Sequence, residues 1–384
     1  MVTAAMDLTF SPADEKFRAE ARAWLAAHVP RVPLPSLETA AGFAAHRAWE
    51  AELAADRWSV VSWPRRYGGR DAGLLGWLLF EEEYWAAGAP GRVGQNGVDL
   101  LAPTLLEHGT REQCARVLPS MASGEVVWAQ AWSEPEAGSD LASLTSRAVR
   151  ADGGWLLSGQ KTWSSRAAFA DRAFGLFRSD PGAARPHQGL TYLMFDLRAP
   201  GVTVRPIGRL DGRPAFAELF LDEVFVPDED VIGEPGQGWR IAMSAAGNER
   251  GLTLRSPGRF LAAAHRLVGL WRARGCPEHA RERVADAVIG ARAYRLFTYA
   301  AASRFLAGDR LGPETSMNKV FWSELDLALH ETALDLLGPE GEAADGTWSQ
   351  GYVFALAGPV YAGTNEIQRD IIAERLLGLP KGRR

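Results

Sequence analysis

The sequence predicts an α+β chain: a helical region, then a region of short strands, then a second helical region. Apolar residues recur at helical spacing near the N-terminus, short aromatic and aliphatic runs separated by turn residues fill the middle, and long helical stretches follow Gly233. The 384 residues are too many for one ordinary core. We therefore expect an N-terminal α-helical domain (1–121), a middle antiparallel β-barrel or β-sheet domain (122–232) and a C-terminal helical bundle (233–384).

The N-terminal region begins with a clear helix start. Ser11 is a good N-cap, Pro12 suits the first turn, and Asp14 faces the positive end of the helix dipole. The apolar residues that follow lie on one helical face: Phe17, Ala21, Trp24 and Leu25. Further helices are expected over Phe43 to Asp56, Leu74 to Ala87 and Asp99 to Leu106.

The middle region has the short period of strands. Turn residues such as Asp152-Gly153-Gly154 and Asp211-Gly212 separate the runs, and no helix-length pattern lies between them, which argues against a βαβ unit. The expected strands are Trp155 to Gly159, Ala173 to Phe177, Thr191 to Leu197, Val202 to Pro206 and Phe216 to Val226.

The C-terminal region is again helical, with short connections. The expected helices are Gly238 to Gly251, Pro257 to Arg274, Pro277 to Leu306, Pro313 to Leu337 and Tyr361 to Leu377. The run from Gly346 to Asn365 carries no charge and is long enough to resemble a membrane span. Its glycines and Pro359 break it up, so we expect a buried or cofactor-facing segment and no membrane insertion.

Composition excludes several classes of protein. The net charge of −5 weighs against a general nucleic-acid binder, and acidic residues interrupt any signal peptide at the N-terminus. The two cysteines, Cys114 and Cys276, form no paired motif, so a disulfide framework is improbable. The seven histidines include no H-E-x-x-H, and neither a P-loop nor a dinucleotide fingerprint occurs. We expect a cytoplasmic protein with no metal site.

Three polar segments remain as candidates for chemistry. Residues 130–140 offer hydroxyl and carboxyl acceptors near the start of the β region, residues 159–165 place a tryptophan at a polar strand end, and residues 361–369 lead a Gly-Thr turn into a helix. Taken one by one, these residues equally fit an ordinary polar loop, a tryptophan packed between layers and a solvated ion-pair face.

Together and in this order, the segments resemble the acyl-CoA dehydrogenase family of flavoproteins. The motifs are Ser133-Glu134-Pro135-Glu136-Ala137-Gly138-Ser139-Asp140 and Tyr361-Ala362-Gly363-Thr364-Asn365-Glu366-Ile367-Gln368-Arg369. Phe225-Val226-Pro227 and Gly236-Gln237-Gly238-Trp239 also fit, and the likeness covers nearly the whole chain. It implies a C-terminal four-helix bundle, with FAD between that bundle and the β domain.

The resemblance also implies roles for single residues. Gln130, Trp132 and Ser133 would line the flavin ring, with Ser139 close to phosphate or substrate. Trp163 would flank the ring and Ser165 would approach its N5 edge. Thr364 and Glu366 would meet the FAD from the C-terminal side. The implied reaction is α,β-dehydrogenation of an acyl-CoA, or of an acyl-carrier-protein thioester, with electrons passed to an electron-transfer flavoprotein.

This reaction needs a carboxylate to remove the α-proton. Many family members carry it directly after the tyrosine of the Y-x-G-T motif, where this chain has Ala362. Other members place the glutamate on the first bundle helix, just before an arginine, and Glu249-Arg250 stands at the matching place. We therefore assign Glu249 as the base and Arg250 as its orienting or substrate-contacting neighbour. The alternative is an exposed helix-surface pair.

Further departures from the family pattern concern the assembly of the protein into oligomers. The R-x-x-F-G and Q-x-F-G-G-x-G segments of many members are absent from residues 272–281 and 335–341, and Arg166-Ala167 is an unusual pair after Ser165. The pattern resembles bacterial members that act on bulky acyl-CoAs, some with a homologous partner subunit, so a homo- or hetero-oligomer is expected. The other functions left open are a flavin oxidase or monooxygenase and a non-catalytic partner subunit.

Overall fold

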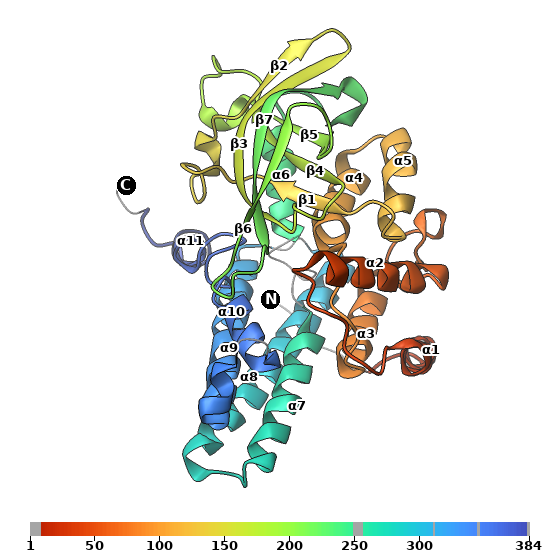
Figure 1. The fold of residues 1–384 in the computed structure, drawn as a ribbon, viewed down its shortest axis with the longest axis vertical. Helices are drawn as coiled ribbons and strands as arrows, with labels where there is room; N and C mark the ends of the chain where they lie inside the picture. The colour runs from red at the N-terminus through yellow and green to blue at the C-terminus, as the bar shows by residue number, and fades with distance from the viewer. Residues whose placement is uncertain (1–8, 249–255, 310–311, 344–345, 382–384) are drawn as a thin grey trace. The chain divides into compact units, whose positions relative to one another are not determined.

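The computed structural model describes residues 9–248, 256–309, 312–343 and 346–381 (Figure 1). The chain divides into two compact units. Unit 1 draws on the stretches 1–31, 72–89 and 249–384, and unit 2 draws on 32–71 and 90–248. The expected succession of helical, β and helical regions is confirmed. The domain boundaries expected at residues 121 and 232 stay a prediction.

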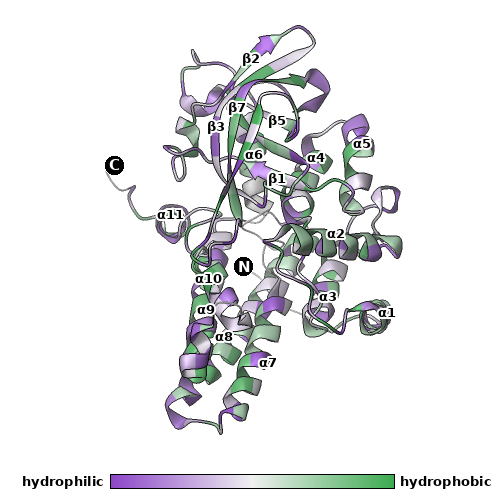
Figure 2. Ribbon diagram, viewed as in Figure 1, coloured by the Kyte–Doolittle hydropathy of each residue, from purple (hydrophilic) through white to green (hydrophobic). Residues whose placement is uncertain are grey.

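Unit 2 is built on one eight-stranded sheet. The strands run in the order β6-β7-β3-β2-β4-β5-β8, with β1 paired to β4. Strand β5 is apolar and buried along nearly its whole length (Figure 2). The strands are β1 (Trp128–Ala131), β2 (Arg147–Ala151), β3 (Gly154–Ser165), β4 (Arg172–Arg178), β5 (Leu190–Asp196), β6 (Val202–Ile207), β7 (Phe216–Pro227) and β8 (Val231–Ile232).

The sheet is antiparallel in most of its pairings, as expected, but not in all. Strand β1 runs parallel to β4, and a single parallel pair also joins β2 to β4. Gly175 permits the close approach of β1, because a Cβ added there would lie 2.3 Å from the Ala131 carbonyl oxygen. The four-residue β1 is too short to be recognised from alternation, which is why the parallel pairing was not predicted.

Helices pack beside this sheet within unit 2. Thr39 caps α2 by accepting a hydrogen bond from the Gly42 backbone N–H at 3.1 Å. Thr110 and Gln113 form a capping box on α5. The helices of unit 2 are α2 (Ala40–Ala55), α4 (Ala102–His108), α5 (Arg111–Ala122) and α6 (Gly238–Asn248), with a π-helical turn over Asn96–Leu101.

Unit 1 is helical. Its helices are α1 (Pro12–His28), α3 (Gly73–Ala86), α7 (Pro257–Ala273), α8 (Glu278–Leu306), α9 (Glu314–Leu337), α10 (Thr347–Ala355) and α11 (Asn365–Ile371), followed by a π-helical turn over Ile372–Leu376. Helix α1 begins at Ser11 with the predicted cap, and Asp14 completes a capping box. The last helix begins at Asn365 rather than at Tyr361, because Ala362 and Gly363 have φ of 55° and 79°.

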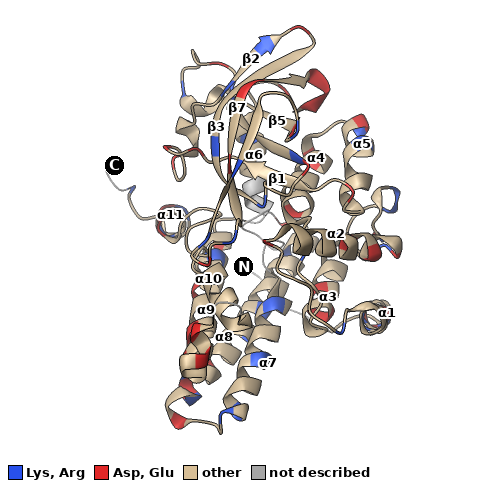
Figure 3. Cartoon of the chain, in the orientation of Figure 1, with Lys and Arg blue, Asp and Glu red and all other residues tan. Residues whose placement is uncertain are grey.

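The core of unit 1 lies between α7, α8 and α9. Phe260, Trp322 and Leu329 are buried there, and the rings of Phe260 and Tyr294 meet edge to face at 5.1 Å. Charged residues of both signs lie along α8 and α9 (Figure 3). The apolar contacts of this core hold the three helices together.

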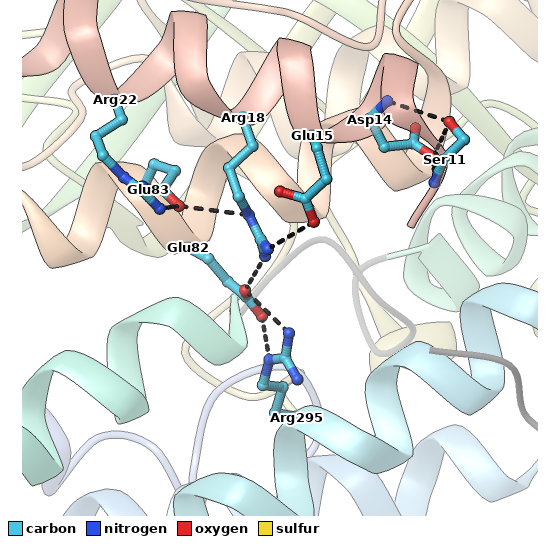
Figure 4. A network of polar contacts seen from close by, with 8 residues as sticks. All are labelled: Ser11, Asp14, Glu15, Arg18, Arg22, Glu82, Glu83 and Arg295. Carbon is cyan, nitrogen blue, oxygen red and sulfur yellow. Dashed lines mark hydrogen bonds and ion pairs between the residues drawn. The ribbon is translucent and has the colours of Figure 1, made fainter. Parts of the chain in front are cut away.

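An ion-pair network joins α1, α3 and α8 (Figure 4). The Glu82 carboxylate accepts from Arg18 at 2.9 Å and from Arg295 at 2.5 Å. Both oxygens of Glu83 accept from Arg22 at 2.8 Å. Four of these five side chains are mostly shielded from water, so the loss of any one of them would leave a partly buried charge unpaired. The network fastens the two N-terminal helices of this unit to the bundle.

The uncharged run 346–365 forms α10 and the turn before α11. It is not buried as a whole, since Val360 is 64% exposed and Leu356 is 37% exposed. Its other expected role, facing a cofactor, stays a prediction. None of the helices in the described ranges combines the length and apolar character needed to span a bilayer. The described part of the chain also contains no cluster of three His, Cys, Asp or Glu side chains that could hold a metal ion.

Candidate functional site

The first two candidate segments lie together in unit 2. The backbone N–H of Thr162 donates to the Ser133 carbonyl at 2.9 Å, which joins the end of β3 to the chain leaving β1. Gln130 is half-buried in β1, opposite Phe174 of β4. The structure therefore brings Gln130, Trp132 and Ser133 next to the segment that carries Trp163 and Ser165.

Trp132 is fixed by a neighbouring tyrosine. Its indole N–H donates to the Tyr192 hydroxyl at 3.2 Å, and the two rings meet edge to face with centroids 6.2 Å apart. The indole is only partly buried. A tryptophan held in one orientation at the edge of a sheet can serve as a fixed wall for a planar ligand.

A buried ion pair connects the same two segments. The Lys161 ammonium is fully buried and donates to Glu134 at 2.8 Å and to the Leu176 carbonyl at 2.7 Å. Glu134 also accepts from the backbone N–H groups of Thr145 and Ser146 at 2.6 and 2.9 Å. Because both charges are paired and hydrogen-bonded, this cluster fixes the chain on either side of it.

Burial and pairing shift both pKa values. Burial raises the pKa of Glu134, but the Lys161 charge and the surrounding hydrogen bonds outweigh it and bring the value to about 2. Burial lowers the pKa of Lys161 to about 8, against the attraction of Glu134. Both groups therefore carry their charge at neutral pH.

Ser139 lies farther along the same loop. It is exposed, and so are Gly138 and Asp140 beside it. A few residues on, Arg178 donates to the carbonyls of Ala142 and Leu144 at 2.7 and 3.2 Å, which holds the loop close to β4. Ser139 is thus an accessible hydroxyl on a loop that is tied down at both ends.

Trp163 has the backbone and the exposure of a ligand-contacting residue. It is 60% exposed, and it is the only exposed residue among the fourteen tryptophans, all of which the structure describes. Its φ is 59°, in the left-handed region, and its ring meets Phe216 edge to face at 5.8 Å. Strained residues of this kind concentrate at binding sites. The exposed, oriented indole could stack on a planar ligand.

Ser165 ends strand β3 and is half-buried. Its carbonyl accepts from the Asn96 side-chain amide at 3.5 Å. The hydroxyl of Ser164, one residue earlier, is buried and has no hydrogen-bond partner among the described residues. Polar groups without a protein partner at this strand end are consistent with a bound polar ligand.

The third segment lies in unit 1 and forms a tight turn before α11. The Gln368 side-chain amide donates to the carbonyls of Ala362 and Gly363 at 3.0 and 3.4 Å. Thr364 is the N-cap and accepts from the Ile367 backbone N–H at 3.3 Å. The turn is therefore defined by its own side chains, with Thr364 at its tip.

A buried lysine holds this turn to helix α9. The Asn365 side-chain oxygen accepts from the fully buried Lys319 at 2.8 Å and from Ser323 at 3.1 Å. Glu366 is exposed and lies 3.9 Å from Arg369, as expected of a solvated face. The backbone amides at the helix start, together with the Thr364 side chain, lower the pKa of Glu366.

The proposed catalytic pair, Glu249 and Arg250, lies outside the described residues. Helix α6 is described up to Asn248. Ala362, at the place where many family members carry their base, is in the left-handed region with φ of 55°. Its methyl group offers no acid–base chemistry.

Family models match almost the whole length of the chain. The N-terminal, middle and C-terminal domains of acyl-CoA dehydrogenases match residues 11–125, 129–224 and 236–377. The chain belongs to the acyl-CoA dehydrogenase family. It is accordingly an enzyme of the flavin oxidoreductase class, with FAD as the cofactor, as the sequence motifs implied.

Relatives of this acyl-CoA dehydrogenase include two mycobacterial proteins. The acyl-CoA dehydrogenase IpdE1 of Mycobacterium tuberculosis is 38% identical over 96% of this chain and 98% of its own length. IpdE1 of Mycolicibacterium smegmatis is 37% identical over the same shares of the two chains.

Solved structures of family members have the same fold. A structure titled "Tcur3481-Tcur3483 steroid ACAD" is 28% identical with a TM-score of 0.86, and covers 98% of this chain and 100% of its own. The ChsE4-ChsE5 complex from Mycobacterium tuberculosis is 27% identical with a TM-score of 0.85, over the same shares.

The cofactor contacts assigned from the sequence of this acyl-CoA dehydrogenase stay predictions, and the residues that hold those segments in place were not found from the sequence. Lys161 and Glu134 lie within the first two candidate segments, but neither was assigned a role from the sequence. Lys319 and Asn365 are separated by 46 positions, and Arg166 and Glu38 by 128. No spacing rule connects such pairs. The only sequence feature that pointed to these residues was a charged side chain in an otherwise apolar or small-residue stretch.

Proposed function

We propose that this acyl-CoA dehydrogenase carries out FAD-dependent α,β-dehydrogenation of an acyl-CoA thioester. The observation that carries the proposal is Trp163, an oriented indole with 60% exposure that stands beside Ser165 at the end of β3. The indole combines this exposure with a left-handed φ of 59° and an edge-to-face contact with Phe216, so it is held in one orientation on which a planar ligand can stack.

In this proposal the cofactor is held from unit 2 by residues of the first two segments. Gln130, Trp132 and Ser133 line one part of the flavin ring, Trp163 flanks it, and Ser165 approaches its N5 edge. Ser139 lies near phosphate or substrate. Thr364 and Glu366 are the proposed cofactor contacts of the third segment. Bound FAD supplies the hydride acceptor for the β-hydrogen of the substrate.

Glu249 is proposed as the base that removes the α-proton, with Arg250 as the neighbour that orients it or contacts the substrate. A carboxylate in an apolar site holds a proton well, and hydrogen bonds to the thioester oxygen stabilise the developing enolate. The support is the Asn248-Glu249-Arg250-Gly251 sequence together with the alanine at position 362.

A bulky acyl group is the proposed substrate class. The support is the likeness to a structure titled as a steroid ACAD, together with the missing R-x-x-F-G and Q-x-F-G-G-x-G segments. CoA is the proposed carrier, with an acyl-carrier protein as the alternative. Electrons pass to an electron-transfer flavoprotein, and the protein acts in the cytoplasm.

We propose that the enzyme works as an oligomer, with a second copy or a homologous chain. Two solved relatives are titled with two chains each. Helices α8 and α9 also leave large apolar side chains open to solvent. These are Ile289, Leu296, Phe297, Phe305, Leu306, Met317 and Phe321. An apolar surface of this kind suits a protein interface.

Replacing Trp163 with alanine is expected to weaken FAD binding roughly 10-fold, because one aromatic wall of the ring is lost. Trp163→Phe is expected to keep most of the affinity. The protein should remain folded, since the indole is mostly exposed. The measurement is a flavin fluorescence titration of the apoprotein. Trp24→Ala in α1 serves as the control, and an equal loss of affinity in that variant would refute the assignment of Trp163.

The direct test of the proposed reaction is product analysis. The purified enzyme is incubated with acyl-CoAs and an artificial electron acceptor, and each product is examined by mass spectrometry. A product two hydrogens lighter, with a new α,β double bond, supports the proposal. Oxygen uptake without any acceptor would indicate an oxidase instead. A colourless chain that becomes active only with a homologous partner would indicate a non-catalytic subunit.

A further inference from the structure

The turn that follows strand β3 is held in an unusual backbone conformation. Arg166 has φ of 54°, three residues after Trp163 with φ of 59°. The pairing of β3 with β7 is also irregular between Lys161 and Ser164. Two left-handed residues without glycine in one strand end are unfavourable by themselves, so surrounding contacts must impose this shape.

The Arg166 side chain forms a shielded ion pair with Glu38. Its Nε and Nη2 atoms each lie 3.3 Å from the same carboxylate oxygen, Oε1. The Glu38 side chain is 6% exposed and the Arg166 side chain 17%. The other oxygen of Glu38 is buried and has no hydrogen-bond partner among the described residues. Glu38 therefore depends on Arg166 for the compensation of its charge.

Backbone contacts fix the arginine from its other side. The Arg166 N–H donates to the Ala215 carbonyl at 2.8 Å, and the Arg166 carbonyl accepts from the Phe169 N–H at 2.9 Å. The Phe169 ring packs on Phe43 of α2 with centroids 5.4 Å apart. The turn is thus tied to β7 through its backbone and to the start of α2 through its side chains.

Arg166 is directly bonded to Ser165 and lies three residues from Trp163, the two residues of β3 that the proposed function places against the flavin. Any change in the Arg166 backbone is transmitted to Ser165 through one peptide bond. Ser165 is also paired with Phe216 in the β3–β7 ladder, and the Asn96 contact to the Ser165 carbonyl is long, at 3.5 Å.

We propose that Arg166, through its ion pair with Glu38, is a positioning residue that holds Trp163 and Ser165 in their cofactor-binding geometry. This inference rests on the proposed function. The ion pair fixes the left-handed turn, and the turn sets the direction of the Trp163 indole and the place of Ser165. Arg166 itself is not assigned any contact with the cofactor or the substrate.

The test compares Arg166→Gln, Arg166→Lys and the double variant Glu38→Gln/Arg166→Gln with the wild-type holoenzyme. The double variant leaves no unpaired buried charge, so it keeps the test informative if the single variant fails to fold. The control is Arg47→Gln. Arg47 pairs with Asp171 at 3.0 Å and also ties α2 to the sheet region, at a position five residues after Arg166.

The readouts are the dissociation constant of FAD, the visible spectrum of the bound flavin and the melting temperature of the apoprotein. Arg166→Gln and the double variant are expected to weaken FAD binding by about 10-fold or more and to alter the flavin spectrum, because Trp163 and Ser165 lose their fixed positions. Arg166→Lys is expected to keep affinity within about 3-fold of wild type, since a lysine still pairs with Glu38. Arg47→Gln should lower the melting temperature without changing the spectrum.

Three results would overturn this inference. If wild type binds FAD and both glutamine variants keep its affinity and spectrum, the positioning role is wrong while the proposed function stands. If Arg47→Gln weakens FAD binding as much as Arg166→Gln does, the effect is general loss of structure. A wild-type protein that binds no flavin at all would overturn the proposed function and this inference together.

Discussion

Replacing Glu249 with glutamine is expected to reduce turnover about 1,000-fold while FAD stays bound. Glutamine keeps the shape of the side chain but cannot accept the α-proton. Because the cofactor contacts are assigned to other residues, the flavin spectrum should be unchanged. The measurement is the rate of flavin reduction under anaerobic conditions, compared between the variant and wild type.

Position 362 offers a matched second variant. Ala362→Glu in the Glu249→Gln background places a carboxylate where many family members carry their base. Ala362 already has a Cβ and adopts a left-handed φ of 55°, so the turn should accept the glutamate side chain at little further cost in conformational free energy. Partial recovery of turnover would support the assignment. Full activity of Glu249→Gln alone would show that another group is the base.

Replacing Lys161 with methionine is expected to destabilise the protein by about 3 to 5 kcal/mol, because the buried Glu134 carboxylate loses its only cationic partner among the described residues. Glu134 would keep its backbone hydrogen bonds to Thr145 and Ser146 but not the compensation of its charge. Denaturant unfolding of the apoprotein measures the change.

The double variant Glu134→Gln/Lys161→Met is the control for that experiment. It removes both charges and is expected to be more stable than Lys161→Met alone. Asp228→Asn, which breaks the exposed Arg150 pair, should lower the free energy of unfolding much less than Lys161→Met does. If Lys161→Met lowered the free energy of unfolding no more than Asp228→Asn did, the buried pair would have no special structural role.

The same pair predicts the pH dependence of stability. The pKa of Glu134 falls from an ordinary 4.5 to about 2 on folding, so the unfolded chain binds the proton more readily. The stabilisation is complete above pH 4.5 and is lost as the pH falls toward 2, by about 2 to 3 kcal/mol. In the Glu134→Gln/Lys161→Met variant, the loss of stability that protonation of Glu134 causes at low pH should disappear. Unfolding curves between these pH values test it.

The order of helical and β regions was predictable because periodicity is a local property. The start of α1 at Ser11 and the breaks around residues 275 and 338 can be read from residue types alone. The parallel pairing of β1 with β4 could not be read from residue types, because it depends on which strands, distant in sequence, meet in the fold. The late start of α11 depends on Ala362 adopting a left-handed φ that alanine rarely adopts.

The candidate ligand contacts could be proposed only through motifs and stay predictions, while the residues that hold them in place could not be inferred from the sequence. Trp163 stood out from the sequence because of the motif around it, but its exposure and its φ came from the structure. The partner of Arg166 could not be inferred, because many acidic residues precede the sheet and only the fold selects Glu38. The unusual residue after Ser165 thereby acquires a physical explanation.

Trp163 and Ser165 are proposed to hold a flavin that an acyl-CoA reduces. The most direct measurement is anaerobic titration of the flavin-loaded protein with a panel of acyl-CoAs, from short linear chains to bulky ring-bearing groups. We expect at least one bulky acyl-CoA to bleach the flavin absorbance in wild type, and none to do so at a comparable rate in Glu249→Gln. Absence of bleaching with every thioester would contradict the account.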